Sequence, residues 1–355
     1  MDNVFNNYEI YLGTVSGSLL HFTTDRRGEK SAYLRKDEKC DVTALSWGRT
    51  SQEVLIGYKN GNVKIFDTVL NNVTVIKKSD TCRIVGVIPV ENDILIVENS
   101  GNVLHWSGDS CQSYLTNDDR ERTIEKAVLN PYKHNILGIG GVNNDIKLYD
   151  VLSKKVVFHG KSDRNDELNL AQPVYVNSIT YFKDGSGMDL GTVTQQGQIR
   201  IYDTRTQRRP ILVYKNLDSV YTSIAATNSD KEVVVGSSKG YLQLMDLRSS
   251  IKPVKTFKGF MGGITDITCD QESPRVASCS LDRYFRIHNL EEKNLEYQEY
   301  MKIQMTCMLM RTKTCMQSDD ADEATEIVEE VYDDGKAEKR GKIQKSNDKK
   351  KLKTC

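Results

Sequence analysis

One short pattern recurs along the chain and restricts its fold more than any other feature. The fullest copy is EVLIGYKNGNVKIFD, residues 53–67, which predicts two short strands joined by a tight turn. Val63 and Ile65 alternate with polar residues, as in a strand with one buried face, and Asn60-Gly61 suits the positive φ angles of a type I′ turn. A single hairpin cannot bury its apolar face alone, so the rest of the chain has to cover it.

Six further copies of this hairpin occur, one before it and five after it. Measured at the turn, successive copies lie 44, 40, 43, 53, 43 and 43 residues apart. Several end in an aromatic residue followed by aspartate, as in Phe66-Asp67 and Tyr202-Asp203. A repeat of about 40–45 residues with this ending is typical of WD repeats, each of which forms one blade of a β-propeller. The turn positions are Gly17, Gly61, Gly101, Asn144, Gly197, Gly240 and Arg283.

A second apolar pattern predicts how the ring closes. Two apolar residues three positions apart precede each hairpin except the first, and they predict an additional, innermost strand. The seventh pair, Met305/Met308, comes after the last hairpin. Seven hairpins and seven inner strands match only if the last strand completes the first blade, which leaves no open sheet edge at the seam. The other pairs are Val42/Leu45, Ile84/Val87, Ile124/Ala127, Val176/Ile179, Tyr221/Ile224 and Ile264/Ile267.

The repeat pattern ends near residue 310, where the composition changes. We therefore predict an all-β fold, a seven-bladed WD40 propeller over residues 1–310 and a disordered charged tail over 311–355. Residues 319–334 contain nine acidic and no basic residues, and residues 336–353 contain nine basic residues. Within the basic part, a lysine cluster resembles a nuclear localisation signal, although a short lysine cluster can also serve only to keep a tail soluble. The cluster consists of Lys349, Lys350, Lys351 and Lys353.

The sequence lacks the motifs of the common catalytic and nucleotide-binding sites. It contains no G-x-x-x-x-G-K-[ST], no G-x-S-x-G and no H-E-x-x-H, and none of its eight cysteines forms a C-x-x-C pair. No apolar run approaches the ~18 residues that span a bilayer, and the first residues do not resemble a secretory signal. We therefore expect an intracellular binding protein that is not an enzyme and uses no cofactor, metal, membrane or small-molecule substrate.

Two stretches outside the repeat pattern are candidate binding sites. The long step between the fourth and fifth hairpins places an insertion at residues 160–175, which carries Arg164, Asn165 and Asp166. Insertions in repeat proteins map to loops on one face, often a binding face, although this one could also be a polar excursion that two leucines hold on the ring. The second stretch is Gln207-Arg208-Arg209-Pro210, where adjacent arginines could clamp a phosphate or carboxylate, or simply form a solvated turn.

The last hairpin carries a third candidate. Asp282 comes directly before the tight turn, where an aspartate commonly accepts backbone hydrogen bonds, so we expect Asp282 to be structural. Its neighbour Arg283 is a candidate for contact with a partner.

Three stretches together resemble one family. Arg164-Asn165-Asp166, Gln207-Arg208-Arg209-Pro210 and ASCSLDRYFRIH, residues 277–288, are similar to WD-repeat-containing protein seventy-four, and the resemblance covers most of residues 8–310. Glu167 departs from the family, which tends to have an aromatic residue there. The resemblance implies that the protein is a non-catalytic scaffold in the biogenesis of the large (60S) ribosomal subunit. It implies a location in the nucleus, within the nucleolus. It also implies binding to pre-60S particles and assembly factors and release by an AAA-type ATPase.

The stretches that carry the resemblance also contain the residues that we predict to contact a partner. These residues are Arg164, Asn165, Asp166, Gln207, Arg208, Arg209 and Arg283. Because the charge of the predicted propeller is balanced, we expect contacts with pre-ribosomal RNA only locally, at arginines such as Arg164, Arg208 and Arg209.

A function of a different class stays open. Asp203-Thr204-Arg205 and Asp246-Leu247-Arg248 place Asp-x-Arg after the third strand of consecutive predicted blades. This arrangement resembles the WDxR motif of substrate receptors of cullin-RING ubiquitin ligases. Trp is absent from both copies, and the motif is short. Recovery of large-subunit proteins and precursor RNA with the chain would favour the first function, and recovery of a ligase adaptor would favour the second.

Overall fold

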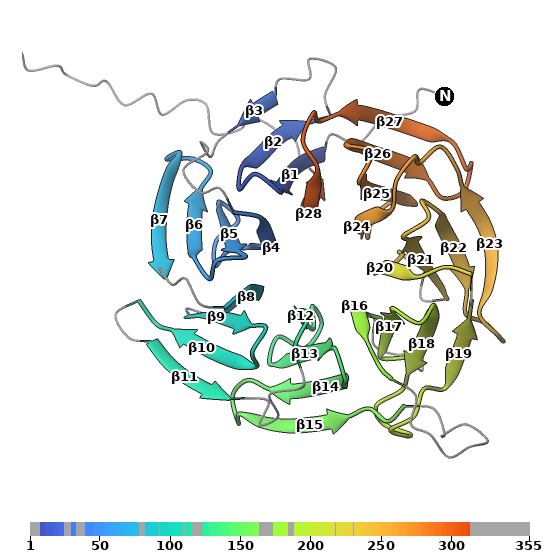
Figure 1. Cartoon of the computed structure of the whole chain (residues 1–355), viewed down its shortest axis with the longest axis horizontal. Helices are drawn as coiled ribbons and strands as arrows, with labels where there is room; N and C mark the ends of the chain where they lie inside the picture. The colour runs from blue at the N-terminus through green and yellow to red at the C-terminus, as the bar shows by residue number, and fades with distance from the viewer. Residues whose placement is uncertain are drawn as a thin grey trace, which may run out of the picture. The chain divides into compact units, whose positions relative to one another are not determined.

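The described part of the chain forms a ring of seven four-stranded antiparallel sheets (Figure 1). The computed structural model describes residues 8–24, 30–32, 40–77, 82–91, 93–108, 111–115, 123–162, 173–183, 188–216, 218–229 and 231–312. All of them lie in the first of two compact units, Met1–Thr314, the second being Cys315–Cys355. Within the described residues no helix is present that could cross a membrane. The predicted seven-bladed propeller is therefore confirmed, and β28 extends to Thr312, past the predicted boundary at residue 310, whereas the rest of the predicted tail lies outside the described residues.

Each blade has one strand at the central channel and three further strands towards the outside. Blade 1 consists of β28 (Met305–Thr312), β1 (Tyr8–Thr14), β2 (Leu19–Thr23) and β3 (Lys30–Ala32). Blade 2 consists of β4 (Val42–Trp47), β5 (Glu53–Tyr58), β6 (Val63–Asp67) and β7 (Asn72–Lys77). Blade 3 consists of β8 (Ile84–Val90), β9 (Asp93–Glu98), β10 (Asn102–Trp106) and β11 (Cys111–Leu115). Blade 4 consists of β12 (Lys126–Leu129), β13 (Ile136–Gly141), β14 (Asn144–Asp150) and β15 (Lys155–His159).

The remaining three blades follow the same order. Blade 5 consists of β16 (Val176–Tyr181), β17 (Leu190–Thr194), β18 (Gln198–Tyr202) and β19 (Leu212–Lys215). Blade 6 consists of β20 (Tyr221–Ala226), β21 (Glu232–Ser237), β22 (Leu242–Asp246) and β23 (Lys252–Phe257). Blade 7 consists of β24 (Ile264–Cys269), β25 (Arg275–Ser280), β26 (Tyr284–Asn289) and β27 (Leu295–Tyr300). Six of the seven predicted inner strands begin at the first residue of their apolar pair, and Ile124 lies just before β12.

The last described strand completes the first blade, as the count of strands predicted. β28 pairs antiparallel with β1, in a register that runs from Tyr8 opposite Thr312 to Thr14 opposite Met305. The side chains of β28 alternate between the two neighbouring blades. Met305 and Met308 pack in the cluster shared with blade 7, whereas Cys307 packs in the cluster shared with blade 2. Strand alternation therefore lets one strand seal two seams at once.

The hairpin turn differs from the predicted type I′ geometry. Gly61 has a φ of 88°, but Asn60 does not have a positive φ. The Gly61 N–H donates to the Tyr58 carbonyl at 3.2 Å, and the Tyr58 N–H donates to the Asn62 carbonyl at 3.0 Å. This is a type I turn followed by one left-handed residue, because the loop contains one residue more than a type I′ hairpin allows. In blade 4 the positive φ falls on Asn143, one position before the predicted turn residue.

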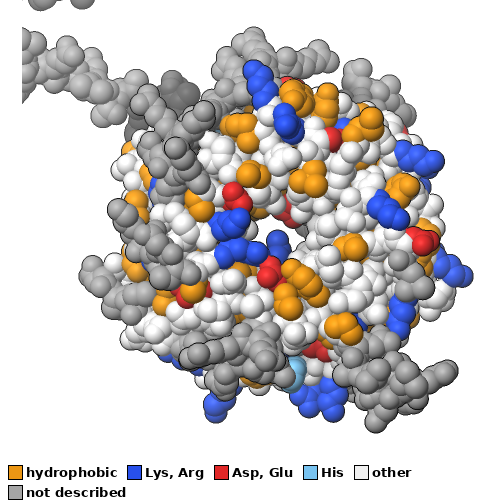
Figure 2. Space-filling model, in the orientation of Figure 1, with side chains coloured by type: hydrophobic (Ala, Val, Ile, Leu, Met, Phe, Trp, Pro, Cys, Tyr) orange, Lys and Arg blue, Asp and Glu red, His pale blue; other side chains and the backbone are white. Residues whose placement is uncertain are grey.

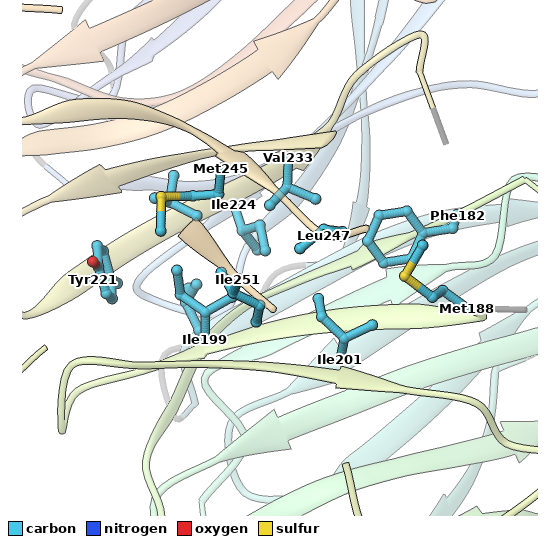
Figure 3. Packing of buried hydrophobic residues seen from close by; sticks show 12 residues of the cluster. Phe182, Met188, Ile199, Ile201, Tyr221, Ile224, Val233, Met245, Leu247 and Ile251 are labelled. Carbon is cyan, nitrogen blue, oxygen red and sulfur yellow. The ribbon is translucent and has the colours of Figure 1, made fainter. Parts of the chain in front are cut away.

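The core consists of seven hydrophobic clusters, one at each seam between neighbouring blades. Figure 3 shows the cluster between blades 5 and 6, in which Ile199 and Ile201 face Val233 and Met245. All four side chains are fully buried. Each blade is thus covered on both faces, so its middle strands are apolar on both sides and the ring depends on every seam.

A row of side chains near the start of the inner strands links successive blades. The hydroxyl groups of Thr43, Thr222 and Thr306 each donate, at 2.6 Å, to the carbonyl of the first inner-strand residue of the next blade. For Thr306 that acceptor is Val42, so this bond crosses from blade 1 to blade 2. Thr265 occupies the same position in blade 7, yet its buried hydroxyl has no hydrogen-bond partner among the described residues.

We expect Thr306→Val and Thr265→Val to have different effects on stability. Valine has nearly the same shape as threonine, so the first change removes a partly buried hydrogen bond and should lower the free energy of unfolding by about 1 kcal/mol. The second removes a hydroxyl that is buried without a partner, so stability should be unchanged or up to about 1 kcal/mol higher. Urea denaturation at pH 7 measures both values. Equal losses in the two variants would contradict a role for these interblade bonds.

Candidate functional site

The structure joins two of the predicted binding regions at the seam between blades 4 and 5. The Lys161 N–H donates to the Arg208 carbonyl at 2.8 Å, and Arg208 Nε donates to the His159 carbonyl at 2.9 Å. In Figure 1 the end of β15 accordingly approaches the loop between β18 and β19 at the outer edge of the ring. The Gln207–Pro210 stretch is thus attached to the segment that leads into the insertion. Arg164, Asn165 and Asp166 themselves lie outside the described residues.

The loop of residues 203–211 is ordered by short polar contacts. Asp189 accepts a hydrogen bond from the Thr204 N–H at 2.7 Å, and the Asp203 carboxylate accepts one from the Arg205 N–H at 3.1 Å. The side-chain amide of Gln207 donates to the Pro210 carbonyl at 3.3 Å. These contacts fix the backbone of the loop, so the arginine side chains extend from a defined position.

The two adjacent arginines, Arg208 and Arg209, differ in the contacts that their side chains make with the ring. Arg208 gives its Nε donor to the backbone of β15, so part of its role is to attach the loop to blade 4. Arg209 is exposed, and no contact of its side chain with the described residues is seen. Arg209 is therefore the member of the pair that is better placed for a partner, and its role in binding stays a prediction.

A buried ion pair crosses the same seam between blades 4 and 5, and sequence reasoning missed it. Arg200 on β18 is 1% exposed, and its NH1 atom lies 3.2 Å from the Asp145 Oδ1 atom on β14. Gln198 accepts a hydrogen bond from Arg200 Nε at 2.8 Å, and the Ser162 hydroxyl donates to the other oxygen of Asp145. The pair therefore connects blade 5, blade 4 and the first residues of the insertion. Removing one partner of such a pair leaves a buried charge uncompensated.

Arg283 lies on blade 7, away from this seam, in a strained turn. Its φ is 69°, a left-handed conformation that five other blades give to glycine at the same position. A side chain in this conformation costs about 1–2 kcal/mol, and such strain tends to occur at functional sites. The side chain of Arg283 is exposed, which is compatible with its predicted contact with a partner.

Asp282 is structural, as predicted. Its carboxylate accepts hydrogen bonds from the Tyr284 and Met261 N–H groups at 3.0 and 3.2 Å. It also forms an ion pair with Arg286 at 2.8 Å, and both side chains are almost fully buried. Asp282 therefore connects the β25–β26 turn to the segment that leads into β24.

The charges on the visible face are mixed. In Figure 2 Lys and Arg side chains lie next to Asp and Glu side chains around the mouth of the central channel, with hydrophobic side chains scattered between them. Directly before the inner strands β4, β8 and β12 in the sequence, charged residues are also paired: Asp41 with Lys59 at 3.2 Å, and Arg83 with Glu125 at 2.7 Å. The charges seen on this face therefore compensate one another rather than forming a continuous basic track.

The central channel is a cavity of about 510 Å³ lined by the inner strands. Asp266 lies on its wall and accepts a hydrogen bond from the Met308 N–H at 3.0 Å. Burial raises the pKa of Asp266, against the opposing effect of the positive charge of Lys126. Across the described ranges, no three His, Cys, Asp or Glu residues lie together as metal ligands. The carboxylate of Asp266 thus connects blade 7 to the closing strand.

The two Asp-x-Arg motifs have a local structural explanation. In each of them the arginine N–H donates to the aspartate two residues earlier, at 3.1 Å in Asp203-Thr204-Arg205 and 2.9 Å in Asp246-Leu247-Arg248. The guanidinium groups fold back onto the same aspartates, with distances of 3.3 and 3.2 Å. The spacing therefore suits an aspartate that caps its own turn.

Comparisons with known proteins agree with this architecture. A model of the family described as WD domain, G-beta repeat, matches residues 251–289, which include β23 to β26. WD repeat-containing protein 74 of Bos taurus is 29% identical over 85% of this chain and 80% of its own length. The protein of the same name from Homo sapiens is 28% identical over the same shares. The chain contains one match to the WD repeat within a seven-bladed ring and is similar over most of its length to WD repeat-containing protein 74.

Two further similarities extend these results. The Ribosome biogenesis protein nsa1 of Schizosaccharomyces pombe is 25% identical over 79% of this chain and 81% of its own length. A chain in the structure entitled Crystal Structure of Mitotic Checkpoint Complex superposes with a TM-score of 0.64 at 15% identity, over 77% of this chain and 84% of that chain. The last similarity shows the fold alone, because many unrelated functions share the WD-repeat propeller.

Proposed function

We propose that this WD-repeat protein is a non-catalytic scaffold in the nucleolar biogenesis of the large (60S) ribosomal subunit. The observation that carries the proposal is the similarity, over most of the ring, to WD repeat-containing protein 74 and to proteins named for ribosome biogenesis. A closed ring supports this function physically because seven seams make it a rigid platform that can present several surfaces at once. Its partners would be pre-60S assembly factors, and an AAA-type ATPase would release it.

The charge distribution supports binding mainly to proteins. A surface that neutralises many phosphates loses affinity steeply as salt rises, because counterions are released on binding. The mixed charges around the channel argue against such a surface on the visible face. We expect contacts with precursor RNA to be confined to arginines such as Arg164, Arg208 and Arg209. Association with pre-60S particles should therefore weaken only mildly with salt.

Depletion and replacement in cells tests the proposed function. Loss of the protein should lower the level of large subunits and of their mature RNA, while processing of the small-subunit precursor continues. The unaltered chain should restore both. Normal maturation of large-subunit RNA after complete depletion would contradict the proposal.

Variants of the blade 4–5 surface test the proposed binding residues. Alanine at Arg164, Asn165 and Asp166, or Arg209→Glu alone, should lower co-purification with pre-60S particles several-fold without changing the melting temperature. Arg248→Glu is the matched control, because Arg248 is an exposed arginine of the corresponding loop of blade 6. Unfolding of the triple variant would instead support a structural role for the insertion. Capture of a ligase adaptor by the unaltered chain, together with loss of that capture in the Arg248 variant, would favour the ubiquitin-ligase alternative.

We further propose that the lysines of the tail direct nuclear import. Replacing Lys349, Lys350, Lys351 and Lys353 by alanine removes the basic cluster and should move the protein towards the cytoplasm. Fluorescence microscopy of tagged chains measures the distribution. The control replaces four other tail lysines, Lys336, Lys339, Lys342 and Lys345, and should remain nuclear. Unchanged nuclear accumulation of the first variant would contradict the import signal.

A further inference from the structure

A pocket with a basic lining opens between blades 6 and 7. Its volume is about 330 Å³, and its walls come from the end of β23, from β26 and from β27. Lys258 and Lys293 line it and are exposed to solvent, while Arg286 and His288 lie deeper. None of the described residues that line the pocket is acidic. An anionic group that entered would therefore meet only positive or neutral donors.

His288 is the residue that makes this pocket unusual. It is 4% exposed, and its ring lies between Phe257 and Phe260, with ring centroids at 5.2 and 5.7 Å. Its Nδ1 atom is buried without a hydrogen-bond partner among the described residues. Burial and the neighbouring charge of Arg286 lower the pKa of His288 to about 4. A buried polar atom without a partner is costly, so a group that hydrogen-bonded to it would be bound favourably.

The position of His288 in the repeat also distinguishes blade 7 from the other six blades. The fifth residue after each turn position is a large apolar side chain in the other six blades: Phe22, Phe66, Trp106, Tyr149, Tyr202 and Met245. Only blade 7 has an imidazole at this position. The ring can therefore be built with an aromatic residue there, and the packing of the seam alone does not require histidine.

Arg286 forms the inner wall and is already fixed. Its guanidinium group binds Asp282 through both terminal nitrogens, at 3.2 and 2.8 Å, and donates to the Gly259 carbonyl at 3.1 Å. It also stacks over Phe260 at 4.7 Å. Because Asp282 neutralises Arg286, the two lysines at the mouth would supply most of the net attraction for an anion.

Apolar side chains lie next to this charged site. Met261 is 94% exposed and Leu281 is 49% exposed. The Met261 N–H donates to the same Asp282 carboxylate that binds Arg286, so the backbone of Met261 is linked through Asp282 to one wall of the pocket, and Leu281 directly precedes Asp282. Glu291 and Glu292 are exposed directly before Lys293 and would repel the successive phosphates of a nucleic acid. A single carboxylate with apolar neighbours suits this combination better than a phosphate chain.

We propose that the pocket between blades 6 and 7 binds a glutamate or aspartate side chain of a partner protein, whose apolar neighbours cover Met261 and Leu281. Lys258 and Lys293 would attract the carboxylate, and His288 would complete its hydrogen bonding. This site is separate from the blade 4–5 surface, and the inference holds whichever assembly the ring joins. The proposal names the chemical group that this pocket binds, whereas the blade 4–5 surface is proposed only as a site for partners.

Binding of a peptide to the full chain tests the proposal. The probe is a short, capped and fluorescently labelled peptide with one glutamate flanked by leucines, and its control contains glutamine in place of that glutamate. We expect saturable binding of the first peptide by anisotropy, with a matching shift of the His288 signal in NMR spectra of histidine-labelled protein. Lys258→Glu combined with Lys293→Glu should weaken binding at least tenfold. His288→Phe should weaken it about threefold and keep the fold, because Phe66 occupies the equivalent position in blade 2.

Matched measurements separate the alternatives. Lys252→Glu makes one lysine-to-glutamate change on β23 at an exposed residue outside the pocket and should leave the affinity within about twofold, whereas Lys258→Glu alone should weaken it by more than this. Equal binding of the glutamine peptide, or the absence of a saturable His288 shift, would overturn the proposal. Tighter binding of a uridine oligonucleotide than of the peptide, lost in the Lys258 and Lys293 variant, would overturn the choice of a protein partner.

Discussion

A chain that ends at Lys302 should fail to fold into a stable ring, whereas a chain that ends at Thr314 should melt as the full chain does. The first truncation removes β28, and with it Met305, Cys307 and Met308, which are 0%, 6% and 4% exposed. Burying side chains of this size contributes roughly 2 kcal/mol each, and their sum is comparable to the ~5–15 kcal/mol that stabilises a typical domain. The first truncation also leaves seven residues of β1 without their paired strand.

The second truncation removes none of the described residues and is the matched control. Thermal unfolding followed by circular dichroism compares the three chains at equal concentration. We expect a cooperative transition in the full chain and in the chain ending at Thr314, and no such transition in the shorter one. A cooperative transition within a few degrees of the full chain's, in the protein that ends at Lys302, would show that β28 is dispensable.

Glu9→Gln should also destabilise the ring, because the Glu9 carboxylate on β1 binds Arg311 on the closing strand β28. The Glu9 carboxylate accepts hydrogen bonds from the Arg311 Nε atom at 2.6 Å and from the Tyr11 hydroxyl at 2.7 Å, and it lies 3.2 Å from His21 Nε2. Arg311 also stacks on Trp47 at 4.4 Å. Burial alone would raise the pKa of Glu9, but its contacts with His21, Tyr11 and Arg311 outweigh burial and lower the pKa to about 2.

The lowered pKa gives the expected dependence on pH. An unfolded glutamate has a pKa near 4.3, so between about pH 2 and pH 4.5 the unfolded chain binds more protons than the folded one. The stabilisation by Glu9 is therefore fully present above about pH 4.5 and is lost as the pH falls towards 2. Allowing for partial exposure of the side chain, we expect Glu9→Gln to cost about 2 kcal/mol at pH 7.

Urea denaturation over a range of pH measures this effect. The difference in unfolding free energy between the unaltered chain and the Glu9 variant should narrow as the pH is lowered from 5 to 3. Asp41→Asn is the control, because the Asp41–Lys59 pair is more exposed and should contribute less than about 1 kcal/mol. A difference that stays constant across this range would mean that the charge of Glu9 is not the cause.

The sequence was most informative where one rule applied to every blade. The spacing of the turns and the displaced pair Met305/Met308 together predict the ring and its closure, because each blade repeats the same buried pattern. The turn type at Asn60-Gly61 was wrong because loop length, rather than residue type alone, selects the geometry. The burial of Arg200 was not predicted, because β18 is buried throughout only where neighbouring blades cover both of its faces.

The candidate sites were harder to predict because they depend on contacts between blades. Nothing in Gln207-Arg208-Arg209-Pro210 indicates that Arg208 bonds to His159, which lies 49 residues earlier. The pocket beside His288 likewise forms only where β23 of one blade meets β27 of the next. His288-Asn289 stands where the repeats of blades 2 and 5 have an aromatic residue followed by aspartate, and this divergence is a local signal of the pocket.

The pairing of β1 with β28 also fixes when the protein can become stable during its synthesis. The first strand of the ring leaves the ribosome early, but its partner is the last described strand to be made. Until residue 312 has emerged, β1 keeps an unpaired edge and Tyr8, Ile10 and Leu12 lack part of their cover. Nascent chains with such edges are prone to aggregate and depend on chaperones. Chains interrupted before this point therefore stay recognisable to quality control, so only translation products that include residue 312 yield a closed ring.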